Sequence, residues 1–89
     1  MPVISMFYGI IVRMFFVDIG RHKKPHIHVK YQQYEAVVSI PGGKVLDGYL
    51  PPMRMKLVSA WIEIHKEDLM ADWKLASNGE NVFRIEPLR

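Results

Sequence analysis

The first half of the chain consists of short runs of β-branched and aromatic residues, a composition that favours β-strands. In the run from Ile10 to Val17, alternate side chains fall on opposite faces, and Tyr8-Gly9 forms a turn before it. Gln32-Gln33 and Pro41-Gly42-Gly43 also have the composition of turns. The predicted strands are residues 6–7, 10–17, 26–31, 34–40 and 44–46, with 82–85 as a last short strand.

The second half has the period of an amphipathic helix. Pro51-Pro52 marks its start, because proline is tolerated in the first turn, and Asn78-Gly79 supplies a C-cap. His65 lies on the apolar face and is expected to be half-buried with a polar partner. Because the segment is long for a small domain, one continuous helix and two helices with a break near His65-Lys66 both fit. The positions that recur at steps of three and four are Val58, Trp61, Ile62, His65, Leu69, Trp73 and Ala76.

Strands followed by a helical segment predict a single α+β domain over residues 1–89. We expect an antiparallel sheet of about four to six strands, with one long or two consecutive helices packed on one face. The expected contact residues are Leu57, Trp61, Ile62, Leu69 and Trp73 of the helical segment, and Val12, Met14, Phe16, Ile27, Val29 and Tyr31 of the sheet. The expected outer-face residues are Arg13, Phe15, His26, His28, Lys30 and Glu35.

Composition excludes several classes of site. The chain has 89 residues and no cysteine, which rules out disulfides, thiolate zinc sites and a cysteine nucleophile. The apolar stretch from Ile4 to Val17 is too short to span a bilayer, has Arg13 in its middle and is not preceded by a positive region. We therefore expect core strands rather than a membrane or targeting segment. The lack of cysteine favours a cytoplasmic protein.

Positive charge is concentrated in the first half. Residues 1–45 carry a net charge of +4 and residues 46–89 a net charge of −1, when Lys, Arg, Asp and Glu are counted. Such a basic half favours an anion-facing surface, and nucleic acid is the commonest large polyanion. Cations interleaved with an aromatic such as Phe15 suit single-stranded RNA or DNA, whose phosphates need charge and whose bases need flat surfaces. The candidate nucleic-acid-binding residues are Arg13, Arg21, Lys23, Lys24 and Lys30.

Three of the four histidines lie between residues 21 and 30, and two of them, His26 and His28, share one face of a predicted strand with Lys30. Two imidazoles beside Arg13 would supply a general base and a general acid for RNA cleavage, with the cations on the phosphate. His26 and His28 are therefore the candidate catalytic residues of a metal-independent endoribonuclease.

Two other interpretations of the histidine pair remain open. A metal site would need a third ligand, which Glu35 or His22 would have to provide. Alternatively, both histidines are ordinary strand residues, exposed, hydrogen-bonded or part of a protein interface. Since the chain has no phosphate-binding glycine loop, nucleophile elbow or zinc-finger spacing, no cofactor is expected.

Several segments together resemble the domain-of-unknown-function family 4160. They are residues 1–14, Pro25-His26-Ile27-His28-Val29, Tyr34-Glu35-Ala36-Val37, the step Gly48-x-Leu50-Pro51, Trp61 with His65, Asn78-Gly79-Glu80 and Ile85-Glu86-Pro87-Leu88. The resemblance implies a small bacterial protein, encoded beside a second small protein in an arrangement like that of toxin–antitoxin pairs.

Two functions are consistent with these patterns. The first is the RNA-facing component of a toxin–antitoxin-like pair, either as a metal-independent endoribonuclease or as an RNA binder. The second is a non-catalytic module that binds a protein or a nucleic acid through the open sheet face or a sheet edge. Because the edge of so small a sheet must be covered, we expect self-association or binding of the neighbour-encoded partner.

Overall fold

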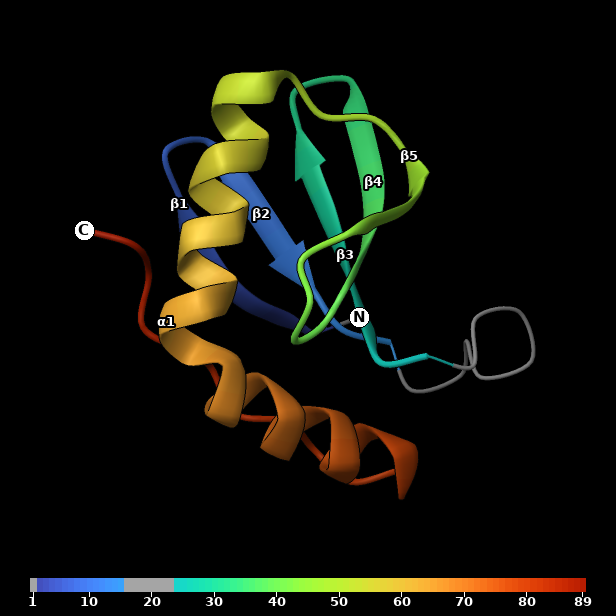
Figure 1. Cartoon of the computed structure of the whole chain (residues 1–89). Helices are drawn as coiled ribbons and strands as arrows, with labels where there is room; N and C mark the ends of the chain where they lie inside the picture. The colour runs from blue at the N-terminus through green and yellow to red at the C-terminus, as the bar shows by residue number, and fades with distance from the viewer. Residues whose placement is uncertain (1, 16–23) are drawn as a thin grey trace.

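The structure is a computed structural model that describes residues 2–15 and 24–89 (Figure 1). Its elements are β1 (Val3–Phe7), β2 (Ile10–Arg13), β3 (His26–Tyr31), β4 (Tyr34–Ser39), β5 (Val45–Gly48) and α1 (Pro52–Ser77). All neighbouring strands are antiparallel and follow one another in the sheet in chain order. The predicted α+β class, with an antiparallel sheet and one long helical segment, is confirmed.

The local signals of the sequence place the turns correctly. Tyr8 and Gly9 connect β1 to β2 with φ values of 51° and 77°, and Gln32, which follows β3, has a φ of 53°. Such left-handed conformations suit tight hairpins, because they match the twist of the flanking strands. The strand bounds differ more. β2 ends at Arg13, and β5 includes Asp47 and Gly48, which the sequence suggested as the end of that strand.

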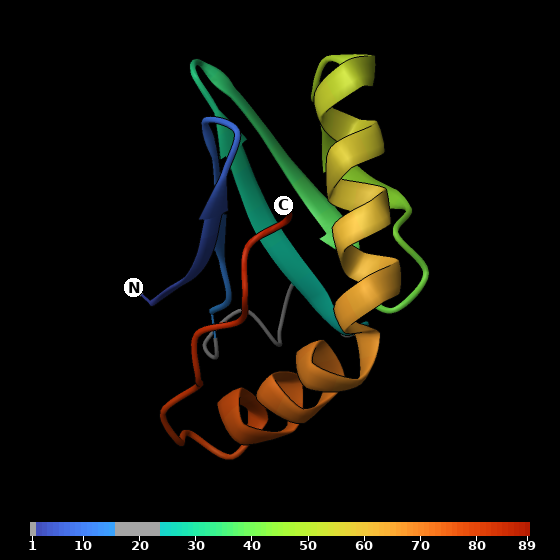
Figure 2. The same ribbon diagram turned by 90° about the vertical axis from the view of Figure 1, so that its left-hand side faces the viewer.

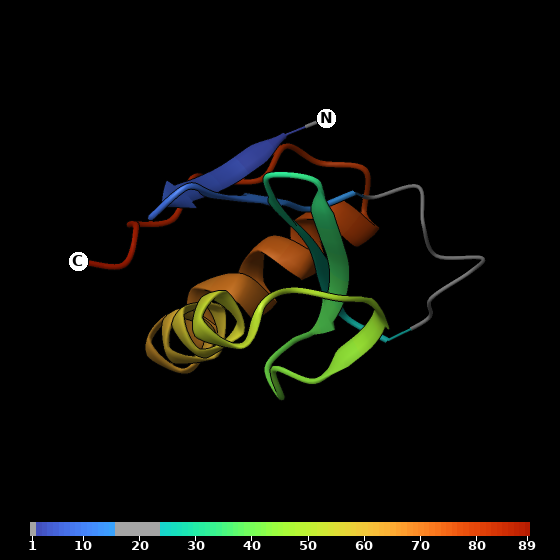
Figure 3. The same ribbon diagram turned by 90° about the horizontal axis from the view of Figure 1, so that it is seen from above.

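One face of the sheet, its inner face, is covered by α1, and its outer face lies on the opposite side (Figure 3). The inner face carries the expected core positions Val12, Met14, Ile27 and Val29, all of which are buried. From α1, the buried residues are Val58, Trp61, Ile62, Leu69, Asp72 and Ala76. Leu57 and Trp73 are half-buried, and Phe16 lies outside the described residues.

The helix bends at His65, whose φ of −111° and ψ of 21° are not helical. Of the two arrangements that fit the sequence, the structure shows the one with a break near His65. Beyond the bend, the second half of α1 runs in a different direction, below the end of the sheet (Figure 2). The His65 side chain is 18% exposed and its Nδ1 lies 3.9 Å from the Asp68 carboxylate, as expected of a half-buried histidine with a polar partner.

The ends of α1 follow the predicted signals. Pro52 occupies the first turn, and Asn78 is the C-cap. Gly79 has a φ of 73° and donates its N–H to Ala76 O at 3.0 Å, while Glu80 donates to Leu75 O at 2.9 Å. This pair of bonds satisfies carbonyls that the end of a helix leaves without partners.

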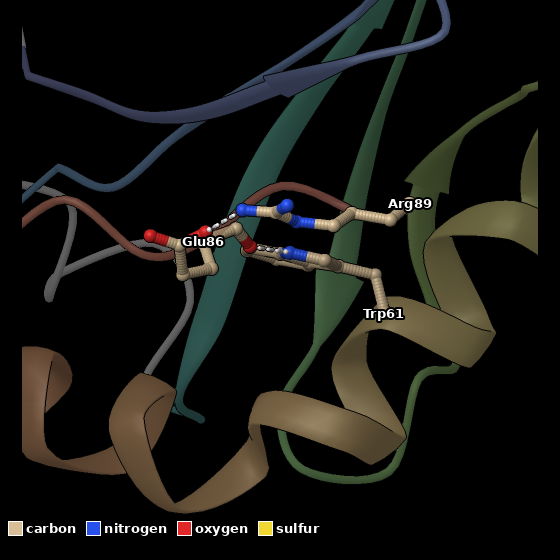
Figure 4. A network of polar contacts seen from close by, with 3 residues as sticks. All are labelled: Trp61, Glu86 and Arg89. Atoms are coloured by element: carbon tan, nitrogen blue, oxygen red, sulfur yellow. Dashed lines mark hydrogen bonds and ion pairs between the residues drawn. The ribbon is translucent and has the colours of Figure 1, made fainter.

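The tail after residue 80 returns along the sheet and closes the core. It forms no regular strand, so the strand predicted at 82–85 is wrong, although Ile85 donates its N–H to Ile4 O at 2.8 Å and partly covers the β1 edge. The Trp61 indole donates to Glu86 O at 2.8 Å, and Arg89 pairs with the Glu86 carboxylate at 2.9 Å (Figure 4). Over the described ranges, no helix is long and apolar enough to cross a membrane.

Candidate functional site on the outer face of the sheet

A pocket of about 340 Å³ opens on the outer face of the sheet. The strand register creates it, because Arg13 of β2 lies opposite His28 of β3, and Lys30 of β3 lies opposite Glu35 of β4. Val37 in turn pairs with Asp47 of β5. The lining residues are Arg13, Phe15, His28, Val29, Lys30, Glu35, Ala36, Val37, Asp47 and Gly48.

The pocket contains an aromatic pair. The rings of Phe15 and His28 meet edge to face, with centroids 4.3 Å apart and an interplanar angle of 88°. Phe15 is half-buried and lines the pocket, so it lies on the outer face as expected and not under α1. An edge-to-face contact of this kind holds both rings in place. The pocket therefore presents an imidazole whose orientation is supported by a neighbouring ring.

Charge is divided across the pocket. The cations Arg13 and Lys30 come from β2 and β3, whereas the acids Glu35 and Asp47 come from β4 and β5. Lys30, Glu35 and Asp47 are exposed, and Arg13 is half-buried. This arrangement is able to bind a group with a negative end and a hydrogen-bond-donating end, such as a nucleotide with its phosphate at Arg13 and its base toward Glu35.

His26 is not exposed as the alternation of the strand predicts. Its ring lies beside that of His28, with centroids 5.3 Å apart, but the side chain is 0% exposed, so the expectation that it faces solvent is wrong. Its Nδ1 donates a hydrogen bond to Lys24 O at 2.8 Å, and its ring centroid lies 5.0 Å from that of Trp73, on the second half of α1. Because β3 begins at His26, the bent helix is able to contact this side chain at the end of the sheet.

The two candidate catalytic histidines thus differ in their exposure. Their ring centroids are 5.3 Å apart, but only His28 lines the pocket. In this structure the His26 side chain is 0% exposed, whereas that of His28 is half-buried. Over residues 2–15 and 24–89, no group of three His, Cys, Asp or Glu side chains is placed to hold a metal ion.

The predicted cations are distributed unequally. Arg13 and Lys30 line the pocket. Lys24 is exposed and supplies the carbonyl that His26 binds. Arg21 and Lys23 lie outside the described residues, as does His22.

Comparison with known proteins identifies the family. The family model "Domain of unknown function (DUF4160)" matches residues 9–74, well over half of the chain. The chain belongs to this family. Neither a curated protein nor a solved structure matches the chain.

All residues that line the outer-face pocket fall within the segment that the DUF4160 model matches. Among those that were not recognised as site residues from the sequence are Asp47 and Gly48 of β5. The sequence indicated only that Asp47-Gly48 closes a short strand after the turn at Pro41-Gly42-Gly43. That signal indicates a hairpin, but the register that brings Asp47 beside Val37 depends on an irregularity between Val37 and Val38.

Proposed function

We propose that this chain is the RNA-binding component of a two-protein accessory system, and that it holds single-stranded RNA on the outer face of its sheet. One observation carries the proposal: in a single pocket two cations and an aromatic ring lie beside an imidazole, with the two acids Glu35 and Asp47 on the side of β4 and β5. Single-stranded RNA is bound through this combination, because cations neutralise phosphates and rings stack on bases. The second protein is the neighbour-encoded one that the family resemblance implies.

Binding is favoured over cleavage by the position of His26. An endoribonuclease without metal needs a base and an acid on either side of the reacting phosphate. His28 lines the pocket and lies opposite Arg13, but His26 is buried against Trp73. We therefore expect RNA to bind and to remain intact, which incubation with total RNA followed by gel analysis would verify.

The test measures binding of a fluorescein-labelled single-stranded oligouridylate by anisotropy over a series of salt concentrations. For the variant with both Arg13→Gln and Lys30→Gln, the slope of log K against log salt should flatten by about 1.4, or about 0.7 for each phosphate that the protein no longer neutralises. The matched control carries Lys56→Gln and Lys66→Gln, two exposed cations of α1, and should keep the wild-type slope.

A second variant separates stacking from charge. Phe15→Leu keeps an apolar side chain but removes the ring, so affinity should fall about tenfold while the salt slope stays unchanged, since stacking on one base is worth about 1–3 kcal/mol. The absence of binding at low salt up to about 100 µM protein would refute the proposal, because even non-specific contact is detected in that range. The proposal would also be refuted if the Arg13/Lys30 double variant and the Lys56/Lys66 control changed the salt slope equally.

A further inference from the structure

A second groove lies on a different part of the molecule, between the second half of α1 and the returning tail. Its volume is about 590 Å³, within the range of pockets that hold small molecules. Figure 2 shows the two segments that form it, with the tail turning back from the end of α1 toward β1. The outer-face pocket and this groove share no lining residue.

The groove contains a buried carboxylate that is only half satisfied. Asp72 is 3% exposed and lines the groove from α1. Its Oδ1 accepts a hydrogen bond from the Phe83 N–H at 3.0 Å, whereas its Oδ2 is buried and has no partner among the described residues. Burying an acceptor without a donor costs free energy, and native proteins almost always provide a partner. A ligand that donates a hydrogen bond would supply the missing partner.

The lining residues as a whole define the chemistry of that ligand. The carboxylates, Asp72 included, outnumber the cations by four to two, and apolar atoms form most of the wall. Glu86 is already paired with Arg89, which leaves Asp72 as the buried acceptor. The charged members are Asp68, Asp72, Glu80, Glu86, Lys74 and Arg84, and the apolar ones are Ala71, Leu75, Phe83 and Ile85.

Access to Asp72 involves the groove wall. Because Oδ2 is itself shielded from water, a ligand has to displace part of the groove wall to reach it; Phe83, which lines the same groove, is 72% exposed. An exposed aromatic ring beside a carboxylate also favours a cation, through the negative face of the ring. Burial raises the pKa of the Asp72 carboxyl, and a bound cation would offset that cost by favouring the ionised form.

We propose that this groove binds a guanidinium or primary ammonium group carried on an apolar or aromatic body, with Asp72 as the acceptor. The group is either a free organic cation or an arginine or lysine side chain of a partner protein. The proposal does not depend on RNA binding, since the two sites have no residue in common.

The test uses benzamidine as the probe and neutral benzamide as its isostere, each titrated into ¹⁵N-labelled protein while amide chemical shifts are followed. Benzamidine should shift the amides of Ala71, Leu75 and Phe83 in a saturable manner, and benzamide should not. A blocked Leu-Arg-Leu tripeptide, with Leu-Gln-Leu as its uncharged match, distinguishes the two sources. Tighter binding of the Arg peptide than of benzamidine would indicate a partner side chain, and the reverse order a free cation.

Asp72→Asn tests the assigned acceptor, because the amide oxygen is still able to accept from Phe83 and the fold should be kept. Benzamidine affinity should fall at least about tenfold, the smallest effect expected when a hydrogen bond to a charged group is removed. Asp68→Asn is the matched control, because Asp68 lines the same groove with a side chain that is 73% exposed, and its effect should stay within about twofold. Equal losses in both variants, or equal shifts by benzamidine and benzamide, would overturn the proposal.

Discussion

Gly48→Ala is the most direct test of how closely β5 approaches β4. Gly48 has a φ of +79°, and a Cβ at this position would collide with the backbone oxygen of Glu35 and lie 2.9 Å from the Cα of Ala36. Both neighbours are backbone atoms, which cannot rotate aside as a flexible side chain does. Alanine here therefore requires β5 to move away from β4.

The expected loss has two parts. An alanine at positive φ costs about 1–2 kcal/mol, of which its smaller freedom in the unfolded chain offsets about 0.4–1 kcal/mol. The steric part adds about 1–3 kcal/mol for overpacking, and about 1 kcal/mol if the bond from the Tyr49 N–H to Glu35 O, now 3.0 Å, is broken. With that hydrogen bond broken, the free energy of unfolding should thus fall by about 2–6 kcal/mol, a large share of the roughly 4–13 kcal/mol expected for a chain of this length.

Gly79→Ala is the matched control. Gly79 also has a positive φ, +73°, but a Cβ there would meet no atom within 4 Å. The substitution therefore carries only the conformational part, about 1 kcal/mol. Urea unfolding followed by tryptophan fluorescence measures both variants, since Trp61 is completely buried. If Gly48→Ala costs no more than Gly79→Ala, then β5 does not approach β4 as described, and the register that brings Asp47 into the outer-face pocket is wrong.

The remaining predictions concern buried polar groups. His26→Ala should lower the free energy of unfolding by about 2–4 kcal/mol, because it leaves a cavity against Trp73 and removes the hydrogen bond to Lys24 O. His28 is half-buried, so His28→Ala should lower it by about 1 kcal/mol. Equal losses for the two variants in urea unfolding would contradict the burial of His26. Burial raises the pKa of the Asp72 carboxyl above its ordinary value of 3.8; the hydrogen bond from the Phe83 N–H lowers it, and the nearby Asp68 raises it. Because the folded pKa is the higher one, the stability that Asp72 contributes is fullest below pH 3.8 and is lost as the pH rises through the folded pKa. The stability of Asp72→Asn relative to wild type should therefore rise over that range in urea unfolding at a series of pH values, and a difference that does not change with pH would count against it.

Much of the fold follows from local signals in the sequence. The alternation of apolar residues, the turns at Tyr8-Gly9 and Gln32-Gln33 and the prolines before α1 predict the antiparallel sheet and the helix, because each depends on a few neighbouring residues. Alternation also places Arg13, His28 and Lys30 on one face. These residues meet across β2 and β3 in the structure.

The position of His26 was decided by tertiary structure. Alternation assigns it to the open face with His28, but at the first residue of β3 the sheet ends, and the bent second half of α1 brings Trp73 against the ring. The bend at His65 sets the direction of that half, and the sequence allowed both a straight and a broken helix. A contact between residues so distant in the chain depends on the path of the whole helix, which local periodicity does not determine.

The half-satisfied carboxylate of Asp72 is a second feature that only the tertiary structure determines. In the sequence, Asp72 is one of several acids spaced along a helix, a pattern that usually indicates a solvated face. Its burial arises because the tail returns across α1 and Phe83 donates its N–H to it. The sequence by itself therefore determined the strands, the turns and the basic face, since those depend on short-range pattern. The tertiary structure decided which polar side chains are buried and which of their atoms lack a partner, because both depend on where the bent helix and the tail meet.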